Sequence, residues 1–205
     1  AHLIAVTVMR DGKVAQRDLV TPSGIDWALE RLPVELGEEA EEQWSGLTNA
    51  YPPLQLGNRT IPLDQPQVMG ILNVTPDSFS DGGKFTDDPG AARVHAALMH
   101  EAGAAIIDIG GESTRPGAAA VWEGDEIKRV VPVVEHCVAM GAAVSIDTRR
   151  PAVMEAALKA GAHLINDVSA LRHDPRSLEF VAASGVPVVL MHAPGEGDDL
   201  HAGGK

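Results

Sequence analysis

Short apolar runs alternate with longer amphipathic segments along most of the chain, from residue 68 onward. Five of these runs have the length of a buried strand, at residues 68–73, 104–109, 143–147, 163–166 and 186–191. The segments between them begin at Asp or Pro and end at Gly, which is typical of helices. This alternation predicts a parallel sheet covered by helices.

Four helices are expected between and after these strands. The first begins at Pro89 and buries Val94 and Leu98 one turn apart. The second covers residues 125–140 and contains Pro132, which should kink it or split it. The other two cover residues 151–161 and 174–185.

Polar side chains close almost every predicted strand. They are Asn73, Asp108, Asp147, the pair Asn166-Asp167, and His192. A doubly wound open sheet and a (β/α)8 TIM barrel both fit the alternation, but only a barrel gathers all strand ends at one mouth. No Gly-rich dinucleotide turn follows the first strand, so we predict an α/β fold of the (β/α)8 TIM barrel type. Such a barrel has eight strands, and we expect this chain to be truncated, with only about the first five.

The first third of the chain has a different pattern. Residues 3–20 predict a β-hairpin, a helix should follow and end or bend at Pro33, and a second hairpin is expected over residues 54–63. We therefore expect an appended hairpin and helix segment over residues 1–50, and the N-terminal part of the barrel over residues 51–205.

Composition and charge limit the partners and the cellular location that we expect for this protein. The 205 residues carry a formal net charge of −13, which disfavours binding to nucleic acid or to an anionic membrane. No stretch is long and apolar enough for a membrane helix, and the N-terminus lacks the pattern of a secretory signal. The single Cys137 cannot form an internal disulfide, so we expect a cytoplasmic protein.

The strand ends offer the groups of a binding site for a small molecule. Asn73 supplies an amide oxygen suited to a Mg²⁺ that keeps most of its waters. A buried carboxylate and carboxamide, Asp147 and Asn166, can pair with a flat heterocycle, and Met191 can form an apolar wall. Taken singly, Asp147 has a structural alternative, because a strand-end Asp often caps the next helix.

Other polar residues near these strand ends also have structural alternatives to ligand binding. Asp108 can contact a ligand or form a structural hydrogen bond, and Asp167 favours a structural role. For Glu112 the plain alternative is an outward loop charge, and His192 is either a packed histidine or a ligand.

Two segments resemble the signature segments of the dihydropteroate synthase family. They are residues 73–83 (NVTPDSFSDGG) and residues 110–117 (GGESTRPG). The resemblance spans roughly residues 53–192 and implies a barrel of the pterin-binding type. It also implies a folate-pathway transferase that joins 4-aminobenzoate to 6-hydroxymethyl-7,8-dihydropterin diphosphate and releases diphosphate.

The same resemblance implies roles for individual residues. The pterin would bind Asp147 and Asn166, with Val168 and Met191 among its apolar contacts. Asn73 would bind Mg²⁺. The remaining roles fall in the two loops: Arg115 on the diphosphate, Thr114, Pro116 and Phe79 around the 4-aminobenzoate, and Asp81 beside a cationic pterin intermediate, so that Thr114, Arg115 and Asp81 take part in catalysis.

Two alternatives remain in view. A pterin-binding methyltransferase that uses methyltetrahydrofolate would have no need for Asn73 as a metal ligand or for Thr114 and Arg115. A non-catalytic pterin-binding relative should have degraded first-loop residues, and here they are intact.

The family also uses segments from later strands that do not occur before Lys205. We therefore expect residues 1–205 alone to be inactive, and the full-length protein to be a homodimer. Sulfonamides should compete for the 4-aminobenzoate position.

Overall fold

The computed structural model describes residues 3–75, 89–113, 121–193 and 195. The chain divides into two compact units, Ala1–Tyr51 and Pro52–Lys205. Each unit is described by itself.

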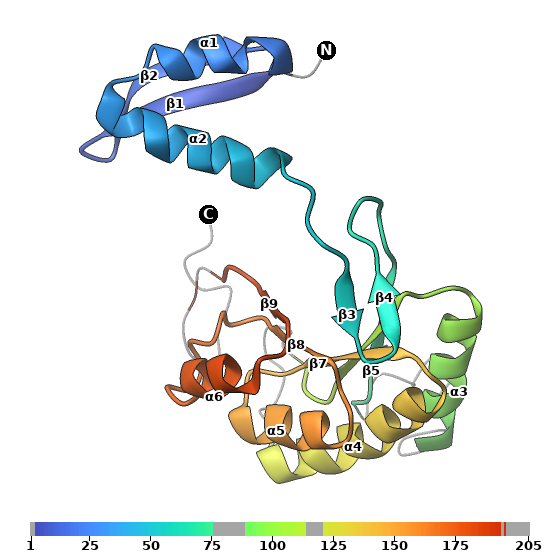
Figure 1. Cartoon of the computed structure of the whole chain (residues 1–205). Helices are drawn as coiled ribbons and strands as arrows, with labels where there is room; N and C mark the ends of the chain where they lie inside the picture. Colours follow the sequence, from blue (N-terminus) through green and yellow to red (C-terminus); the bar gives the residue numbers. More distant parts are fainter. Residues whose placement is uncertain (1–2, 76–88, 114–120, 194, 196–205) are drawn as a thin grey trace. The chain divides into compact units, whose positions relative to one another are not determined.

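The first unit is a hairpin followed by helices (Figure 1). Strands β1 (Ile4–Arg10) and β2 (Lys13–Val20) pair antiparallel, as the sequence predicts. Both residues of the turn between them have positive φ, 51° at Asp11 and 72° at Gly12, which suits the twist of a tight hairpin. The elements that follow are a short 3-10 turn (Pro22–Gly24), α1 (Ile25–Glu30) and α2 (Val34–Thr48).

The second unit begins with another predicted hairpin, β3 (Leu54–Leu56) and β4 (Arg59–Ile61). A sheet of five parallel strands follows. Its strands are β5 (Met69–Asn73), β6 (Ile106–Gly110), β7 (Ala143–Asp147), β8 (Leu164–Asp167) and β9 (Val188–Leu190).

The strands lie in the sheet in the order in which they occur in the sequence, β5-β6-β7-β8-β9. A doubly wound sheet reverses its order at a switch point, whereas a (β/α)8 barrel adds each strand beside the previous one. The observed order is therefore that of the predicted barrel.

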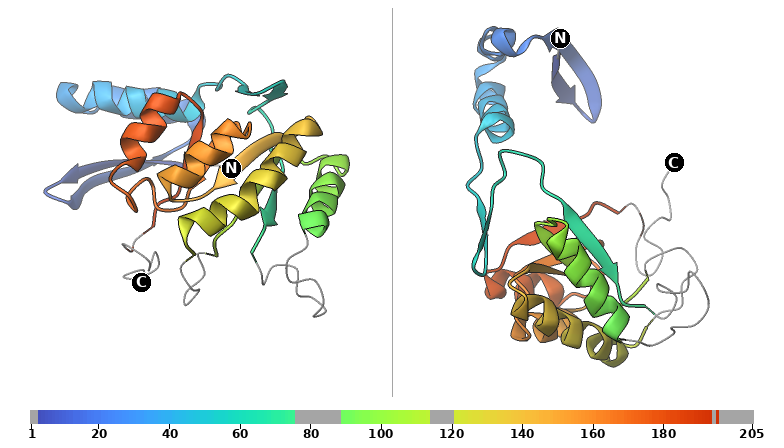
Figure 2. Two further views of the ribbon diagram at one scale, coloured as in Figure 1. Left: turned by 90° about the horizontal axis from the view of Figure 1, so that it is seen from below. Right: turned by 90° about the vertical axis from the view of Figure 1, so that its right-hand side faces the viewer.

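In the part of the chain that the structure describes, four helices connect these strands. They are α3 (Pro89–Glu101), α4 (Glu123–Ala139), α5 (Pro151–Lys159) and α6 (Ser177–Ser184). The views in Figures 1 and 2 show α3, α4 and α5 along one face of the sheet. We call this the outer face and the opposite one the inner face. Helix α4 runs through Pro132 as one element, so a split at that position is excluded.

The prediction that α3 buries Val94 and Leu98 is wrong. Both side chains are exposed, whereas Ala92 and Ala96 are buried against the outer face. The reason is close packing: a Cβ at Gly70 would lie only 2.8 Å from the Met99 sulfur. Small residues on both surfaces let the helix approach the sheet, and its larger aliphatic side chains turn outward.

Apolar residues fill two places in this unit. The main core lies between the outer face and the helices and includes Ile107, Ile109, Val144 and Ile146. A smaller core joins the β3–β4 hairpin to the amino ends of the sheet strands. Its buried members are Leu56, Ile61, Ile106, Ala143 and Leu164.

The hairpin thereby covers the inner face at the amino ends and leaves the carboxyl ends for a site. Among the residues that the structure describes, no helix is long and apolar enough to cross a membrane.

Candidate functional site

Three of the predicted site residues lie in one row at the carboxyl ends of the sheet strands. The register pairs Asn73 with Gly110, Gly110 with Asp147, and Asp147 with Asn166. Paired residues on neighbouring strands point to the same face of a sheet. The side chains of Asn73, Asp147 and Asn166 therefore gather on the inner face, as a shared site requires.

Gly110 forms the floor between two of these side chains. A Cβ at this position would lie 3.4 Å from Asn73 Oδ1 and 3.4 Å from Asp147 Oδ2. The two oxygens thus flank the same point on β6, and the missing side chain keeps the space between them open. A glycine in a sheet strand often marks a place where a ligand comes close to the backbone, and Gly110 is the last residue of β6.

Asp147 has an unusual proton affinity for a carboxylic acid. Burial, followed by the negative charges of Asp108, Glu126, Asp167 and Glu112, raises its pKa to about 7. Near neutral pH the group can therefore donate a hydrogen bond in its acid form or accept one in its ionised form. Such a perturbed group at the end of a strand is a mark of a functional site.

Asn166 is held from below by an acidic side chain. Its Nδ2 donates to Asp108 Oδ2 over 3.0 Å, and Asp108 is only 4% exposed. The neighbouring Asp167 points to the other face and accepts hydrogen bonds from Ser169 N–H, Ser169 Oγ and Leu171 N–H. Asp167 thus has the structural role that the sequence favours.

Val168 and Met191 lie close to this row along the chain. Val168 is half-buried and directly follows β8. Met191 is 40% exposed, and its N–H donates to the Asp167 carbonyl oxygen, which holds it beside the end of β8. Both apolar residues therefore have their backbone near the strand end that carries Asn166.

The other predicted site residues lie outside the described residues. They are Phe79, Asp81, Thr114, Arg115 and Pro116. Their roles remain predictions from the resemblance.

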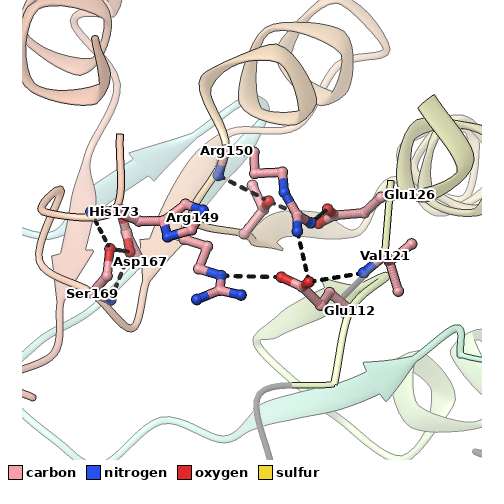
Figure 3. A network of polar contacts seen from close by, with 9 residues as sticks. Glu112, Val121, Glu126, Arg149, Arg150, Asp167, Ser169 and His173 are labelled. Carbon is pink, nitrogen blue, oxygen red and sulfur yellow. Dashed lines mark hydrogen bonds and ion pairs between the residues drawn. The ribbon is translucent and has the colours of Figure 1, made fainter. Parts of the chain in front are cut away.

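A buried ion network beside the row is not predicted from the sequence (Figure 3). It consists of Glu112, Glu126, Arg149 and Arg150, and we call it the rim network. Arg149 Nε donates to Glu112 Oε2 over 3.1 Å, and Arg150 Nη2 donates to Glu112 Oε1 over 2.7 Å. Arg150 Nη1 also pairs with Glu126 on α4. Glu112 is thus buried, and its reading as an outward loop charge is wrong.

The rim network joins three segments that are far apart in the sequence. Glu112 follows β6 and also accepts the Val121 N–H over 3.2 Å, while Thr148 Oγ1 donates to Glu126 Oε1 over 2.8 Å. Burial alone would raise the pKa of Glu112, but the hydrogen bonds from Arg150, Arg149 and Val121 outweigh it and lower the pKa. Burial raises the pKa of Glu126, and its bonds to Thr148 and Arg150 only partly offset this. The network therefore fixes the backbone at the ends of β6 and β7 beside the row.

The donor set suits only some metal ions. Among the described residues, no group of three or more His, Cys, Asp or Glu side chains could hold a metal ion. Asn73 Oδ1 and the nearby Asp147 Oδ2 offer hard oxygen donors but no complete cage. This fits Mg²⁺, which keeps several waters and shares the phosphates of a substrate, and it does not fit a structural zinc site.

The sheet has the strand order of a (β/α)8 barrel and carries polar groups at its carboxyl ends. These features place the protein in the class of α/β proteins of the TIM barrel type. Within that class, residues 69–203 match the family model described as "Pterin binding enzyme". The chain belongs to the pterin-binding enzyme family.

Dihydropteroate synthases are among the proteins to which the chain is similar. It is 54% identical over 126 residues to the dihydropteroate synthase of Bacillus subtilis, a match that covers 61% of this chain and 44% of that protein. The chain therefore spans about half the length of such relatives. A probable bifunctional folylpolyglutamate synthase/dihydropteroate synthase of Haloferax volcanii is 46% identical over 165 residues, covering 80% of this chain and 19% of that protein.

A solved structure agrees with the predicted fold class. The dihydropteroate synthase of Xanthomonas albilineans with 4-aminobenzoic acid superimposes with a TM-score of 0.66 at 53% identity, over 73% of this chain and 55% of that one. The predicted barrel-type fold and the resemblance to dihydropteroate synthase are thereby confirmed.

Proposed function

We propose that this chain carries the pterin-binding and metal-binding part of a dihydropteroate synthase. The reaction joins 4-aminobenzoate to 6-hydroxymethyl-7,8-dihydropterin diphosphate and yields 7,8-dihydropteroate and diphosphate. The observation that carries the proposal is the single row of Asn73, Asp147 and Asn166 around Gly110, at the strand ends that lead into the two signature segments.

The pterin is assigned to Asp147 and Asn166. A pterin edge presents N–H donors beside ring-nitrogen acceptors, and a carboxyl group next to a carboxamide can satisfy both kinds of group. Val168 and Met191 supply apolar contact to the ring faces or edges. Since Asp147 has a pKa near 7, it can adjust its protonation to the tautomer that the ring presents.

Mg²⁺ is assigned to Asn73. When bound, the ion neutralises charge on the diphosphate leaving group. The amide oxygen of Asn73 would hold the ion at the end of β5, and Arg115 would supply guanidinium donors to the same phosphates. Because the protein has a net charge of −13, such local groups must hold an anionic substrate against an unfavourable overall field.

The remaining roles come from the resemblance. Phe79, Pro116 and Thr114 frame the 4-aminobenzoate, and Asp81 stabilises positive charge on the pterin after diphosphate leaves. Aniline nitrogen is a weak nucleophile, so the reaction depends on positioning and charge stabilisation more than on a strong base. Excluding water protects the cation from hydrolysis.

A binding assay followed by an activity assay tests the proposal on the protein in its full natural length. Calorimetric titration with the pterin diphosphate should show binding that Mg²⁺ strengthens, and adding 4-aminobenzoate should then release diphosphate. Asn73→Ala should lose the Mg²⁺ effect, and Asp147→Ala should weaken pterin binding in both conditions. Lys159→Met, at an exposed i,i+4 pair with Glu155, is a control and should leave both unchanged.

The outcomes separate the alternatives. Pterin binding without diphosphate release would indicate a non-catalytic relative, and binding of methyltetrahydrofolate in preference to the pterin diphosphate would indicate a methyltransferase. Competition by a sulfonamide with 4-aminobenzoate would support Phe79 and Pro116 as walls of that position. A homodimer and a cytoplasmic location complete the proposal, and sedimentation analysis tests the first of them.

A further inference from the structure

Asp108 is a buried acid on the inner face that the proposed reaction leaves without a role. It lies two residues before Gly110 on β6 and pairs in register with Ser145 on β7. Residues two apart on a strand share a face, so Asp108 forms a layer directly below the row of Asn73, Asp147 and Asn166.

Asp108 reaches across one strand to bind Asn166. The two residues are on β6 and β8, with β7 between them, and strands two places apart are separated by roughly 10 Å. Asn166 Nδ2 nevertheless lies 3.0 Å from Asp108 Oδ2. Ser145, the residue of β7 that pairs with Asp108, has a small side chain and leaves room for this contact.

An ionised carboxylate can only accept hydrogen bonds, and this decides which way the Asn166 amide faces. The NH₂ group must point down to Asp108, so the carbonyl oxygen Oδ1 is the end left for a ligand. With a neutral partner, either end of the amide could face the ligand. Bonds to a charged acceptor are also stronger than neutral ones, so the preference for one orientation is firm.

The second oxygen of Asp108 supports a role beyond packing. Asp108 Oδ1 is fully buried and has no hydrogen-bond partner among the described residues, and the same holds for Ser145 Oγ. Buried polar groups without a partner are costly in a folded protein. A purely structural position at this depth would be better filled by an apolar side chain.

We propose that Asp108 is a positioning residue that orients the Asn166 carboxamide, so that the site accepts a ligand N–H donor at Asn166 and discriminates against a ligand with an acceptor there. This rests on the proposed function, because it assumes that the ligand is a pterin. A 7,8-dihydropterin carries a hydrogen on N8, whereas a fully oxidised pterin has a lone pair there. The two compounds are therefore a matched pair of probes.

The first test measures dissociation constants for both compounds in the full natural-length protein. The wild type should prefer 7,8-dihydropterin, and Asp108→Asn should reduce the ratio of the two constants by about tenfold, since asparagine permits both amide orientations. Ser145→Ala, at the paired position, should leave the ratio unchanged. An unchanged ratio of the two dissociation constants in Asp108→Asn, including one in which both affinities fall by the same factor, would overturn the proposal.

The second test needs no ligand. Hydrogen exchange of the Asn166 side-chain amide, followed by NMR, should be at least about tenfold faster in Asp108→Ala than in the wild type, with circular dichroism as the check on folding. Equal exchange rates would refute the positioning role. If the wild type binds neither pterin, the proposed function fails, while this exchange measurement still decides whether Asp108 holds Asn166.

Discussion

The two faces of the same five-stranded sheet differ sharply in what they carry. The outer face is mainly apolar and buried under helices, with Ile107, Ile109 and Ile146 fully covered. The inner face carries Asp108, Asp147 and Asn166 near the carboxyl ends, and Ile71 on the same face is 65% exposed. Adjacent residues of one strand thus have different roles. The side chain on the outer face stabilises the fold, and the next one, on the inner face, belongs to the site.

The largest effect is expected in the rim network, whose residues lie on α4 and directly after β6 and β7. Arg150→Met removes one of the two arginine partners of Glu112 and the arginine partner of Glu126, both of which are buried. Breaking a buried pair in this way costs about 3–5 kcal/mol of unfolding free energy, because uncompensated charge stays buried. Urea unfolding at pH 7 measures it.

Lys159→Met is the matched control, since its pair with Glu155 is exposed. It should change the unfolding free energy by at most about 0.5 kcal/mol. If both variants have the same small effect, the rim network contributes nothing to folding.

The second prediction compares one isoleucine from each face. Ile146→Ala on the outer face should cost about 2–5 kcal/mol of unfolding free energy, since it leaves a cavity in the main core. In residues 1–205, Ile71→Ala on the inner face should cost less than about 1 kcal/mol, because the side chain is largely exposed. Equal costs in denaturant unfolding would remove the distinction between the two faces.

The third prediction uses two adjacent glycines, Gly110 at the end of β6 and Gly111 directly after it. A Cβ at Gly111 would lie 2.8 Å from Glu126 Cγ and 2.8 Å from Val130 Cγ1, so Gly111→Ala should destabilise the fold by about 1–3 kcal/mol. At Gly110 the nearest atoms are at 3.4 Å, and Gly110→Ala should fold almost normally. Its methyl group would nevertheless occupy the space between Asn73 and Asp147, and calorimetry should show weaker pterin binding. Normal binding by Gly110→Ala would place the ligand elsewhere.

The fourth prediction is a pH dependence that comes from the inner face. The pKa of Asp147 is about 7 in the folded protein and near 3.8 in the unfolded chain, so the folded state binds more protons between these values. The stabilisation that protonated Asp147 gives to the folded state is fully present below about pH 4 and is lost as the pH rises toward 7. Over this range the unfolding free energy falls by up to about 1.4 kcal/mol per pH unit.

Asp147→Asn should remove this slope. Urea unfolding of the two proteins at pH 5 and pH 7.5, without metal or pterin, measures the difference. An identical pH dependence in the variant would show that Asp147 titrates normally.

The sequence predicts the order and position of the strands well, for physical reasons. Parallel strands are buried on one or both faces, so they appear as short apolar runs, and Gly and Pro mark the helix boundaries. The burial of Val94 and Leu98 was predicted wrongly because large side chains dominate such a pattern. In α3, Ala92 and Ala96 make the close contact, and their importance depends on Gly70 in another strand.

The site also has one part that the sequence predicts and one part that it does not. Asn73, Asp147 and Asn166 stand out because polar residues end apolar strands, and parallel pairing brings such ends together. The rim network could not be predicted, because Glu112 and Arg150 are 38 residues apart and pair only through the way their loops are placed. An acid after Gly-Gly and two arginines after a strand are the only hints that the sequence offers.

The β3–β4 hairpin also limits where a ligand can bind on the inner face. Leu56 and Ile61 pack against Ile106, Ala143 and Leu164, so the hairpin closes the inner face at the amino ends of these strands. A ligand bound to the row of Asn73, Asp147 and Asn166 therefore has an apolar floor some residues below it. The depth to which a ligand can enter is thus set by two short strands that lie outside the parallel sheet.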